Sequence, residues 1–221
     1  IFLSETGGGH RASAVALQAA LTEQYGERVT VRVVDFIREA TPWPWSKAPE
    51  GYQVLGKMPM IYKQLYDCEG ASVSWRQTKT YQMVWWHCRE SVLKYLEQIL
   101  QIGCDMIISV HPLINHMIID ALDTLGARIP VVTVVTDLGS AHLSWFDPRV
   151  DEIVVPSSQV RQLAVQYGFA REKIFLCGLP VREKFWHCPE SQSKVVLKKQ
   201  LGLRGTVVLL MGGGEGFGAM F

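Results

Sequence analysis

The 221-residue sequence lacks several features that mark particular protein classes. Its 22 Lys and Arg are balanced by 21 Asp and Glu, so it has no basic excess of the kind that indicates nucleic-acid binding. Its uninterrupted apolar runs are only a handful of residues long, whereas a membrane-crossing helix needs about 20. A composition that is 48% hydrophobic and 19% charged is typical of a globular protein.

Motifs for metal and redox chemistry are also missing. The five cysteines lie far apart without a C-x-x-C pair, which favours reduced thiols in a cytosol-like compartment. His111 and His116 are close enough in sequence to share a metal, but no third ligand is evident, so we expect no metal site. Neither a D-x-D motif nor the G-K-[ST] of a Walker A loop occurs.

Strand patterns alternate with helical patterns along most of the chain. This alternation predicts βαβ units, and hence a Rossmann-like α/β fold with a parallel sheet and helices on both faces. Residues 41–90 break the pattern, because Pro42 and Pro44 cannot continue a helix or a strand ladder; we expect irregular and helical structure there. The predicted strands are 1–3, 29–36, 106–110, 130–136, 152–155, 174–177 and 207–211. A first helix is predicted after residue 10, and further helices are predicted at 91–102, 115–125, 159–167 and 193–201.

A glycine loop follows the first predicted strand, and a second one follows the last. This repetition predicts two Rossmann-like units in tandem, with an N-terminal domain at 1–188 and the truncated start of a second domain at 189–221. The sequence has no initial Met and stops inside the second glycine loop, so we interpret it as a fragment whose targeting segment is unknown.

The first glycine loop is suited to binding an anion. Glycines at the carboxyl end of a strand let the backbone approach a ligand, and the free N–H groups of the next helix attract negative charge. Gly7, Gly9 and Ala12 also fit the relaxed dinucleotide fingerprint, with Asp35 where a ribose-binding acid would stand. The alternative is a purely structural turn, since such loops are common.

His10 stands at the end of this loop, where strand ends face the ligand crevice of an open α/β sheet. Imidazole is well matched to removing a proton near neutral pH, so His10 is a candidate general base; the alternative is that it only caps or packs against the helix.

The second glycine loop, Gly212 to Gly216, is similarly suited to binding an anion. Two such loops facing across a cleft suit a diphosphate-bearing donor, and glycosyl transfer uses that arrangement without a metal.

Six blocks together resemble the monogalactosyldiacylglycerol synthases in their order. They are SETGGGHRASA (4–14), TPWPW (41–45), IISVHPLINH (107–116), VVTDLGSAHLSWF (134–146), GLPVREKF (178–185) and LLMGGGEGFG (209–218). The resemblance implies a two-domain, B-type, inverting glycosyltransferase that transfers galactose from UDP-galactose to 1,2-diacylglycerol. It implies no cofactor beyond the UDP-sugar co-substrate, and a peripheral location at a plastid envelope or, in bacteria, at the cytoplasmic face of the cell membrane.

The resemblance also implies roles for individual residues. His10 is expected to be the general base. The expected donor-binding residues are Gly9, Arg182, Gly212, Gly213, Gly214, Glu215 and Gly216. The expected acceptor- or lipid-binding residues are Trp43, Pro44, His111, Asp137, His142 and Trp145. The residues themselves leave alternatives open. His111 either lines the cleft or forms a hydrogen bond to a loop. Asp137 either orients His10 or caps the next helix, and we predict the capping role.

Two departures from the family pattern leave the donor sugar open between galactose and glucose. Glu5 stands where the family usually has Asp, and residues 142–146 read HLSWF instead of HPTWF. Two other classes remain as alternatives: a dinucleotide-dependent oxidoreductase using Asp35, and a lipid-surface module without catalysis.

Tryptophans with basic neighbours are concentrated between residues 41 and 90. Such a combination suits the headgroup region of an anionic membrane surface. The alternative is core packing, the more usual position of tryptophan. A membrane interface would need several of the rings exposed together. The rings concerned are Trp43, Trp45, Trp75, Trp85 and Trp86.

Overall fold

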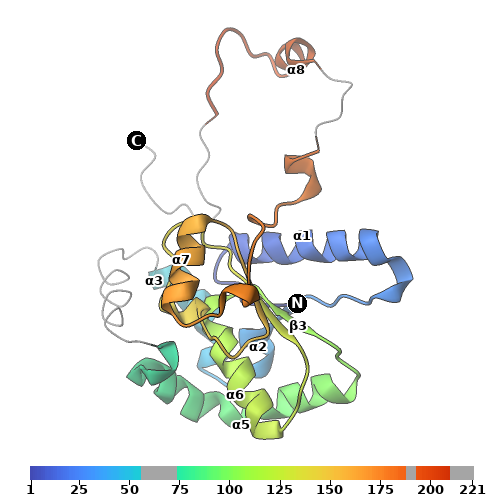
Figure 1. The fold of residues 1–221 in the computed structure, drawn as a ribbon. Helices are drawn as coiled ribbons and strands as arrows, with labels where there is room; N and C mark the ends of the chain where they lie inside the picture. The colour runs from blue at the N-terminus through green and yellow to red at the C-terminus, as the bar shows by residue number, and fades with distance from the viewer. Residues whose placement is uncertain (56–73, 188–192, 210–221) are drawn as a thin grey trace.

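A computed structural model describes residues 1–55, 74–187 and 193–209. Its centre is a six-stranded sheet in which every pair of neighbouring strands is parallel, in the order β2-β1-β3-β4-β5-β6 (Figure 1). The strands are β1 (Phe2–Leu3), β2 (Val34–Asp35), β3 (Ile107–Ser109), β4 (Val131–Val134), β5 (Glu152–Val155) and β6 (Ile174–Leu176). The predicted α/β class with a parallel sheet is confirmed.

Helices cover both faces of this sheet, as predicted. The chain moves in one direction from β1 to β2 and in the opposite direction from β3 to β6, so right-handed crossovers place α1 on one face and α6 and α7 on the other. Figure 1 shows α1 on one side of the strands and α5 and α6 on the opposite side. The helices are α1 (Gly8–Tyr25), α2 (Phe36–Ala40), α3 (Ala48–Leu55), α5 (Lys79–Gln101), α6 (Asn115–Leu125), α7 (Ser158–Gln166) and α8 (Lys194–Gln200).

Short 3₁₀ turns connect several of these elements. They are η1 (Gly26–Arg28), η2 (Trp45–Lys47), η3 (Trp75–Gln77), η4 (Pro112–Ile114), η5 (Leu143–Trp145), η6 (Arg171–Lys173) and η7 (Glu183–Phe185).

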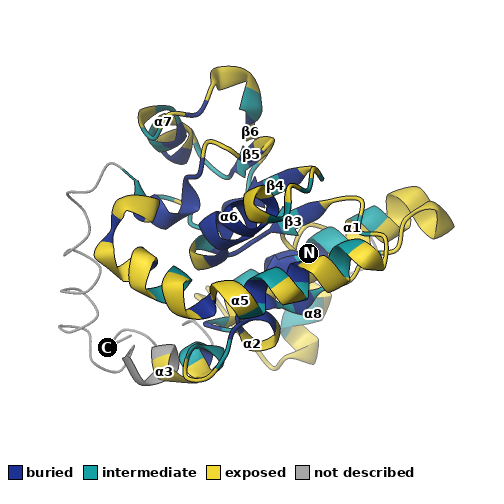
Figure 2. Cartoon of the chain, turned by 90° about the horizontal axis from the view of Figure 1, so that it is seen from below, coloured by how far each residue is buried: buried dark blue, intermediate teal, exposed yellow. Residues whose placement is uncertain are grey.

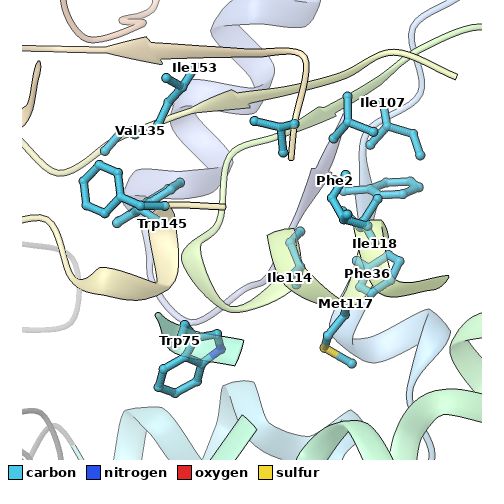
Figure 3. Packing of buried hydrophobic residues seen from close by; sticks show 14 of the residues in the cluster. Phe2, Phe36, Trp75, Ile107, Ile114, Met117, Ile118, Val135, Trp145 and Ile153 are labelled. Atoms are coloured by element: carbon cyan, nitrogen blue, oxygen red, sulfur yellow. The ribbon is translucent and has the colours of Figure 1, made fainter. Parts of the chain in front are cut away.

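Successive strand residues supply two separate apolar clusters, because side chains alternate between the faces of a sheet. Ile107 and Val131 join the larger cluster, together with residues of α2, α5, α6 and α7. Their neighbours Ile108 and Val132 pack on the smaller cluster beneath α1. Figure 3 shows part of the larger cluster, with Trp145 near Val135 and Ile153. The face under α6 is therefore the main core, and Figure 2 shows α6 almost entirely buried while the far end of α1 is exposed.

Helix ends follow capping chemistry that is visible in the sequence. Gly126 ends α6 with φ of 64°, a left-handed conformation that glycine adopts without steric penalty, and α6 has the bounds predicted for it. The side chains of Asp35, Thr78, Ser157 and Ser193 each accept a backbone N–H bond at the start of a helix.

Some predicted elements are wrong or differ in length. The strand expected at 29–36 covers only 34–35, because its partner β1 offers just two residues for pairing. The helix expected at 91–102 is α5, which begins twelve residues earlier at Lys79. Residues 207–209 form no strand, and 210 and 211 lie outside the described part of the chain. Helix α8 buries no residue and is well separated from the sheet in Figure 1.

Candidate functional site

The strand order reverses between β1 and β3, which identifies where this sheet is expected to bind ligands. In open α/β sheets the ligand crevice lies beyond the carboxyl ends of the strands at such a switch point. Residues 4–10 follow β1, Val110 and His111 follow β3, and residues 135–137 follow β4. The predicted site residues His10, His111 and Asp137 therefore come from adjacent strand ends.

His10 lies in the first turn of α1 and is held by groups from two other loops. Its Nδ1 is 2.9 Å from the carbonyl oxygen of Val110 and 2.9 Å from Oγ1 of Thr136. A carbonyl oxygen can only accept, so Nδ1 carries the proton and Nε2 carries the lone pair. Within the described residues, Nε2 forms no hydrogen bond. The ring is partly exposed, and burial lowers the pKa of His10 although Asp137 and the Val110 carbonyl raise it.

His111 lies beside His10, with ring centroids 4.7 Å apart in an edge-to-face arrangement. It is buried, and its Nδ1 accepts the backbone N–H of Leu113. Nε2 therefore carries the proton and donates to Oγ1 of Thr6 at 2.9 Å. Burial holds the pKa of His111 well below its usual value, with a smaller contribution from the nearby His10. His111 is thus a neutral side chain that lines the site, and each of its ring nitrogens forms a hydrogen bond within the protein.

His142 caps η5 and, like His111, accepts a hydrogen bond at Nδ1. Its Nδ1 accepts from the backbone N–H of Ser144 at 3.3 Å and lies 2.8 Å from Oγ of the same residue. Burial lowers the pKa of His142, and Asp137 opposes that effect. Its ring packs edge-on against buried Trp75 at 5.5 Å. Of these three histidines, only His10 has a proton on Nδ1 and a lone pair on Nε2.

Asp137 does not have the predicted capping role. His142 and Ser157 cap the next two described helical elements, η5 and α7, and Asp137 Oδ2 instead accepts the indole N–H of Trp145 at 2.7 Å. Its influence on His10 is a through-space charge effect that raises the pKa of the imidazole.

Trp145 is fully buried, and its predicted acceptor- or lipid-binding role stays a prediction. The ring lies 6.0 Å from the His10 ring and supports it from the core side.

The glycine loop before His10 is open to solvent. A Cβ atom built at Gly7, Gly8 or Gly9 would meet no atom within 4 Å, and none of the three has a left-handed φ. The protein's own conformation therefore does not require glycine here. Three bare backbone positions at the start of α1 leave room for a ligand to approach the helix N–H groups.

Asp35 lies at the end of β2, where a dinucleotide-binding protein would have its ribose-binding acid. Its carboxylate, however, accepts the backbone N–H of Glu5 at 3.3 Å and that of Arg38 at 3.1 Å, and it forms an ion pair with Arg38. Burial raises the pKa of Asp35, and the Arg38 contacts oppose that shift. The carboxylate is therefore engaged in holding the loop and α2.

The segment containing Arg182 runs beside α1. Ser13 Oγ donates to the carbonyl oxygen of Pro180 at 3.2 Å, one helical turn after His10. Arg182 is exposed and its guanidinium lies 5.2 Å from the centre of the Phe185 ring. The predicted Gly212 to Gly216 loop, with Glu215, lies outside the described residues.

The five tryptophans between residues 41 and 90 do not share one environment. Trp43 and Trp86 are 76% and 72% exposed, whereas Trp75 is buried and Trp45 and Trp85 pack partly against the core. Pro44 is also exposed, next to Trp43. The prediction of a lipid-facing group is thus compatible with two of the five rings, and the core interpretation fits the other three.

A second polar cluster lies between α5, α6 and residues 147–149. Arg149 donates to Asp147, Asp120 and Asp123, while Tyr81 donates to Asp120. Buried His116 lies beside it, 3.7 Å from Asp147 Oδ2, and neither of its ring nitrogens has a hydrogen-bond partner. A cavity of about 550 Å³ opens over this cluster. Sequence reasoning did not identify it, because its members are far apart in the chain.

Neither a metal centre nor a membrane-crossing helix is found in the described parts of the chain. Residues 1–55, 74–187 and 193–209 contain no group of three or more His, Cys, Asp or Glu that could hold a metal ion. Over the same ranges, no helix is both long and apolar enough to cross a membrane.

Comparison with known proteins identifies the family. The family model described as monogalactosyldiacylglycerol (MGDG) synthase matches residues 10–181. Over 99% of its length the chain is 35% identical to monogalactosyldiacylglycerol synthase 1, chloroplastic, of Arabidopsis thaliana, and 37% identical to monogalactosyldiacylglycerol synthase, chloroplastic, of Spinacia oleracea. It spans 40% and 41% of the lengths of these relatives. The chain belongs to the monogalactosyldiacylglycerol synthase family.

Proposed function

We propose that the protein containing this chain is a galactolipid glycosyltransferase that transfers galactose from UDP-galactose to the free hydroxyl of 1,2-diacylglycerol with inversion. Family membership supports this activity, since the relatives are named monogalactosyldiacylglycerol synthases. The single structural observation that carries the proposal is the state of His10, whose Nδ1 is held by Val110 and Thr136 while Nε2 has no partner among the described residues.

His10 is the group best placed to act as the general base. A base needs an accessible lone pair, and His111 uses both nitrogens within the protein. The pKa of His10 is lowered chiefly by burial, which keeps the imidazole neutral, and therefore able to accept a proton, at neutral pH.

The reaction is a single displacement. Nε2 of His10 takes the proton of the diacylglycerol hydroxyl while its oxygen forms a bond to the anomeric carbon, and the bond from that carbon to the UDP oxygen breaks on the opposite face. In this proposal the leaving diphosphate is held by backbone N–H groups of the Gly212 to Gly216 loop, which lies outside the described residues, and Arg182 contributes a positive charge. Gly9 and the open start of α1 leave space for the donor beside the base.

The acceptor arrives from a membrane surface. Trp43 and Pro44 are exposed next to each other, and an exposed indole suits the boundary between headgroups and acyl chains. The word chloroplastic in the names of its relatives supports a plastid location, and we propose that the protein lies peripherally on anionic lipid of the plastid envelope.

The test uses the full-length protein with His10→Ala. General-base catalysis contributes about 10² to 10⁴ in rate, so kcat should fall by about that factor while the affinity for UDP-galactose changes little. Turnover is measured with vesicle-borne diacylglycerol, and affinity by calorimetry. The matched control is His87→Ala, at an exposed position on α5, which should keep full turnover. Turnover near the wild-type level in His10→Ala would remove His10 from the mechanism.

A calorimetric series with UDP-galactose, UDP-glucose and NAD tests the donor. Tighter binding of UDP-galactose supports the proposal, and tighter binding of UDP-glucose makes the protein a glucosyltransferase. Binding of NAD alone would support a dinucleotide-dependent oxidoreductase, although the carboxylate of Asp35 is already engaged by Glu5 and Arg38.

A further inference from the structure

Two oxygen atoms from different loops converge on the same nitrogen of His10. Both the Val110 carbonyl and Thr136 Oγ1 lie 2.9 Å from Nδ1. Val110 follows β3 and Thr136 follows β4, so the imidazole is bound by the carboxyl ends of β3, which pairs with β1, and of β4, which pairs with β3. The proton on Nδ1 is shared between these oxygens, with Thr136 Oγ1 as the second acceptor.

The carbonyl alone would not fix the ring. A ring flip about χ2 exchanges the positions of the ring atoms, and a single hydrogen bond of ordinary strength opposes it only modestly. Because Thr136 Oγ1 is a second acceptor on the same side of the ring, a flip would break two hydrogen bonds of Nδ1 instead of one. Trp145 and His111 then limit the movement of the ring from the core side, at 6.0 and 4.7 Å between centroids.

We propose that Thr136 is a positioning residue, whose hydroxyl oxygen works with the Val110 carbonyl to hold His10 in the Nδ1-protonated tautomer with Nε2 directed to the acceptor. This inference rests on the proposed function of His10. Thr136 touches neither substrate nor reacting atoms and acts only through the imidazole. In this respect the hydroxyl takes the place that a carboxylate has in a Ser-His-Asp triad, where a third group orients the base.

The kinetic test compares Thr136→Val with Thr136→Ser in the full-length protein. Valine keeps the shape and removes the oxygen, whereas serine retains it. Loss of one orienting hydrogen bond should lower kcat about tenfold in Thr136→Val, with the KM for both substrates nearly unchanged, and Thr136→Ser should recover most of it. The matched control is Thr124→Val, which removes a hydroxyl that donates to the backbone carbonyl of Asp120 in α6 and should keep full kcat.

A double-mutant cycle separates positioning from a general structural effect. Because Thr136 acts through the imidazole, Thr136→Val should cause no further loss of kcat in a His10→Ala background. A tenfold loss in both backgrounds would overturn the proposal, as would unchanged kcat in Thr136→Val or a serine variant as slow as the valine variant.

A second readout does not depend on turnover. Ring ¹⁵N chemical shifts of labelled histidine, with His10 assigned from the signal lost in His10→Gln, report which nitrogen carries the proton. The wild type should show the Nδ1–H form, and Thr136→Val a mixture of both forms. A wild-type His10 protonated on Nε2 would overturn the positioning role. If the Nδ1–H form is seen but the protein transfers no sugar to diacylglycerol, the proposed function fails, whereas the assignment of the His10 tautomer stands.

Discussion

Backbone and hydroxyl groups near the sheet decide which nitrogen of each histidine carries a proton. His111 and His142 accept backbone N–H bonds at Nδ1, whereas His10 donates from Nδ1 to a carbonyl. The sequence pointed to His10 through its place after a glycine loop, but not to its partners. Thr136 had one available signal, its place at the end of a predicted strand; Val110 acts through a backbone carbonyl, which no side-chain pattern reveals.

The charge of Asp137 provides a test at the residue scale. In Asp137→Asn an amide oxygen can still accept the Trp145 N–H bond, but the negative charge that raises the pKa of His10 is lost. The pKa of His10 should therefore fall further, and the acidic limb of kcat/KM should move to lower pH. The measurement is a pH–rate profile of the full-length protein.

The control for this variant is Asp123→Asn, which removes an exposed carboxylate that bonds Arg149 and leaves the charge beside His10 intact. Its profile should match the wild type. An acidic limb that stays in place or moves to higher pH in Asp137→Asn would contradict the charge argument.

At the scale of elements, Arg149 fastens the loop after η5 to α6. It bonds both oxygens of Asp147 in its own loop, as well as Asp120 and Asp123 of α6. Asp120 and Asp147 are buried. Burial alone would raise the pKa of Asp147, but hydrogen bonds from Arg149 hold it below its usual value. The loop carrying Trp145 is thus anchored by one guanidinium.

Replacing that guanidinium should be strongly destabilising. Arg149→Met leaves the buried carboxylate of Asp147 without its guanidinium partner, whereas Asp120 keeps Arg76 and Tyr81. Breaking a buried ion pair in this way costs about 3–5 kcal/mol of unfolding free energy. Urea denaturation of the full-length protein measures the loss. Arg161→Met, an exposed change on α7, is the control and should stay within about 0.5 kcal/mol of the wild type. Equal stability of the two variants would refute the anchoring role.

The elements were predictable where their ends depend on local chemistry. α6 was predicted at 115–125 because Gly126 supplies the left-handed cap, and strand 152–155 also has the predicted bounds. The start of α5 was missed although Thr78 caps it, because the prolines and tryptophans before it favour irregular structure. The strand predicted at 29–36 was too long, because the length of β2 is limited by its partner β1, which offers only two residues for pairing. Residues 29–36 by themselves do not reveal this limit. The predicted domain boundary at 188–189 remains a prediction.

At the scale of the whole molecule, burial of histidines links folding to pH. Burial is the largest influence on His10, His111, His116 and His142, and it lowers the pKa of each below the usual 6.5. For His116, Asp147 at 3.7 Å opposes this shift, but desolvation prevails and lowers its pKa to about 4. When folding lowers the pKa of a histidine, the unfolded chain binds more protons, so stability falls as pH drops below about 6.5.

His116 alone should account for about 3 kcal/mol of this decline between pH 6.5 and 4. In His116→Leu, urea denaturation across that range should show a flatter pH dependence. Stability at pH 7 should change little, since neither ring nitrogen bonds a described group. His116→Gln also removes the titrating ring and should flatten the curve equally. An unchanged slope in both variants would show that protonation of His116 is not coupled to unfolding.

The hydrogen bond from Ser13 to Pro180 joins segments that are 167 positions apart, at the place where the chain turns away from β6. Ser13 lies one helical turn beyond His10, on the same side of α1. The segment that continues past Arg182 therefore starts from a point held against α1. A bond of about 1 kcal/mol sets a resting orientation without locking it. A displacement of the segment after β6 would therefore pull on α1, the helix that carries His10.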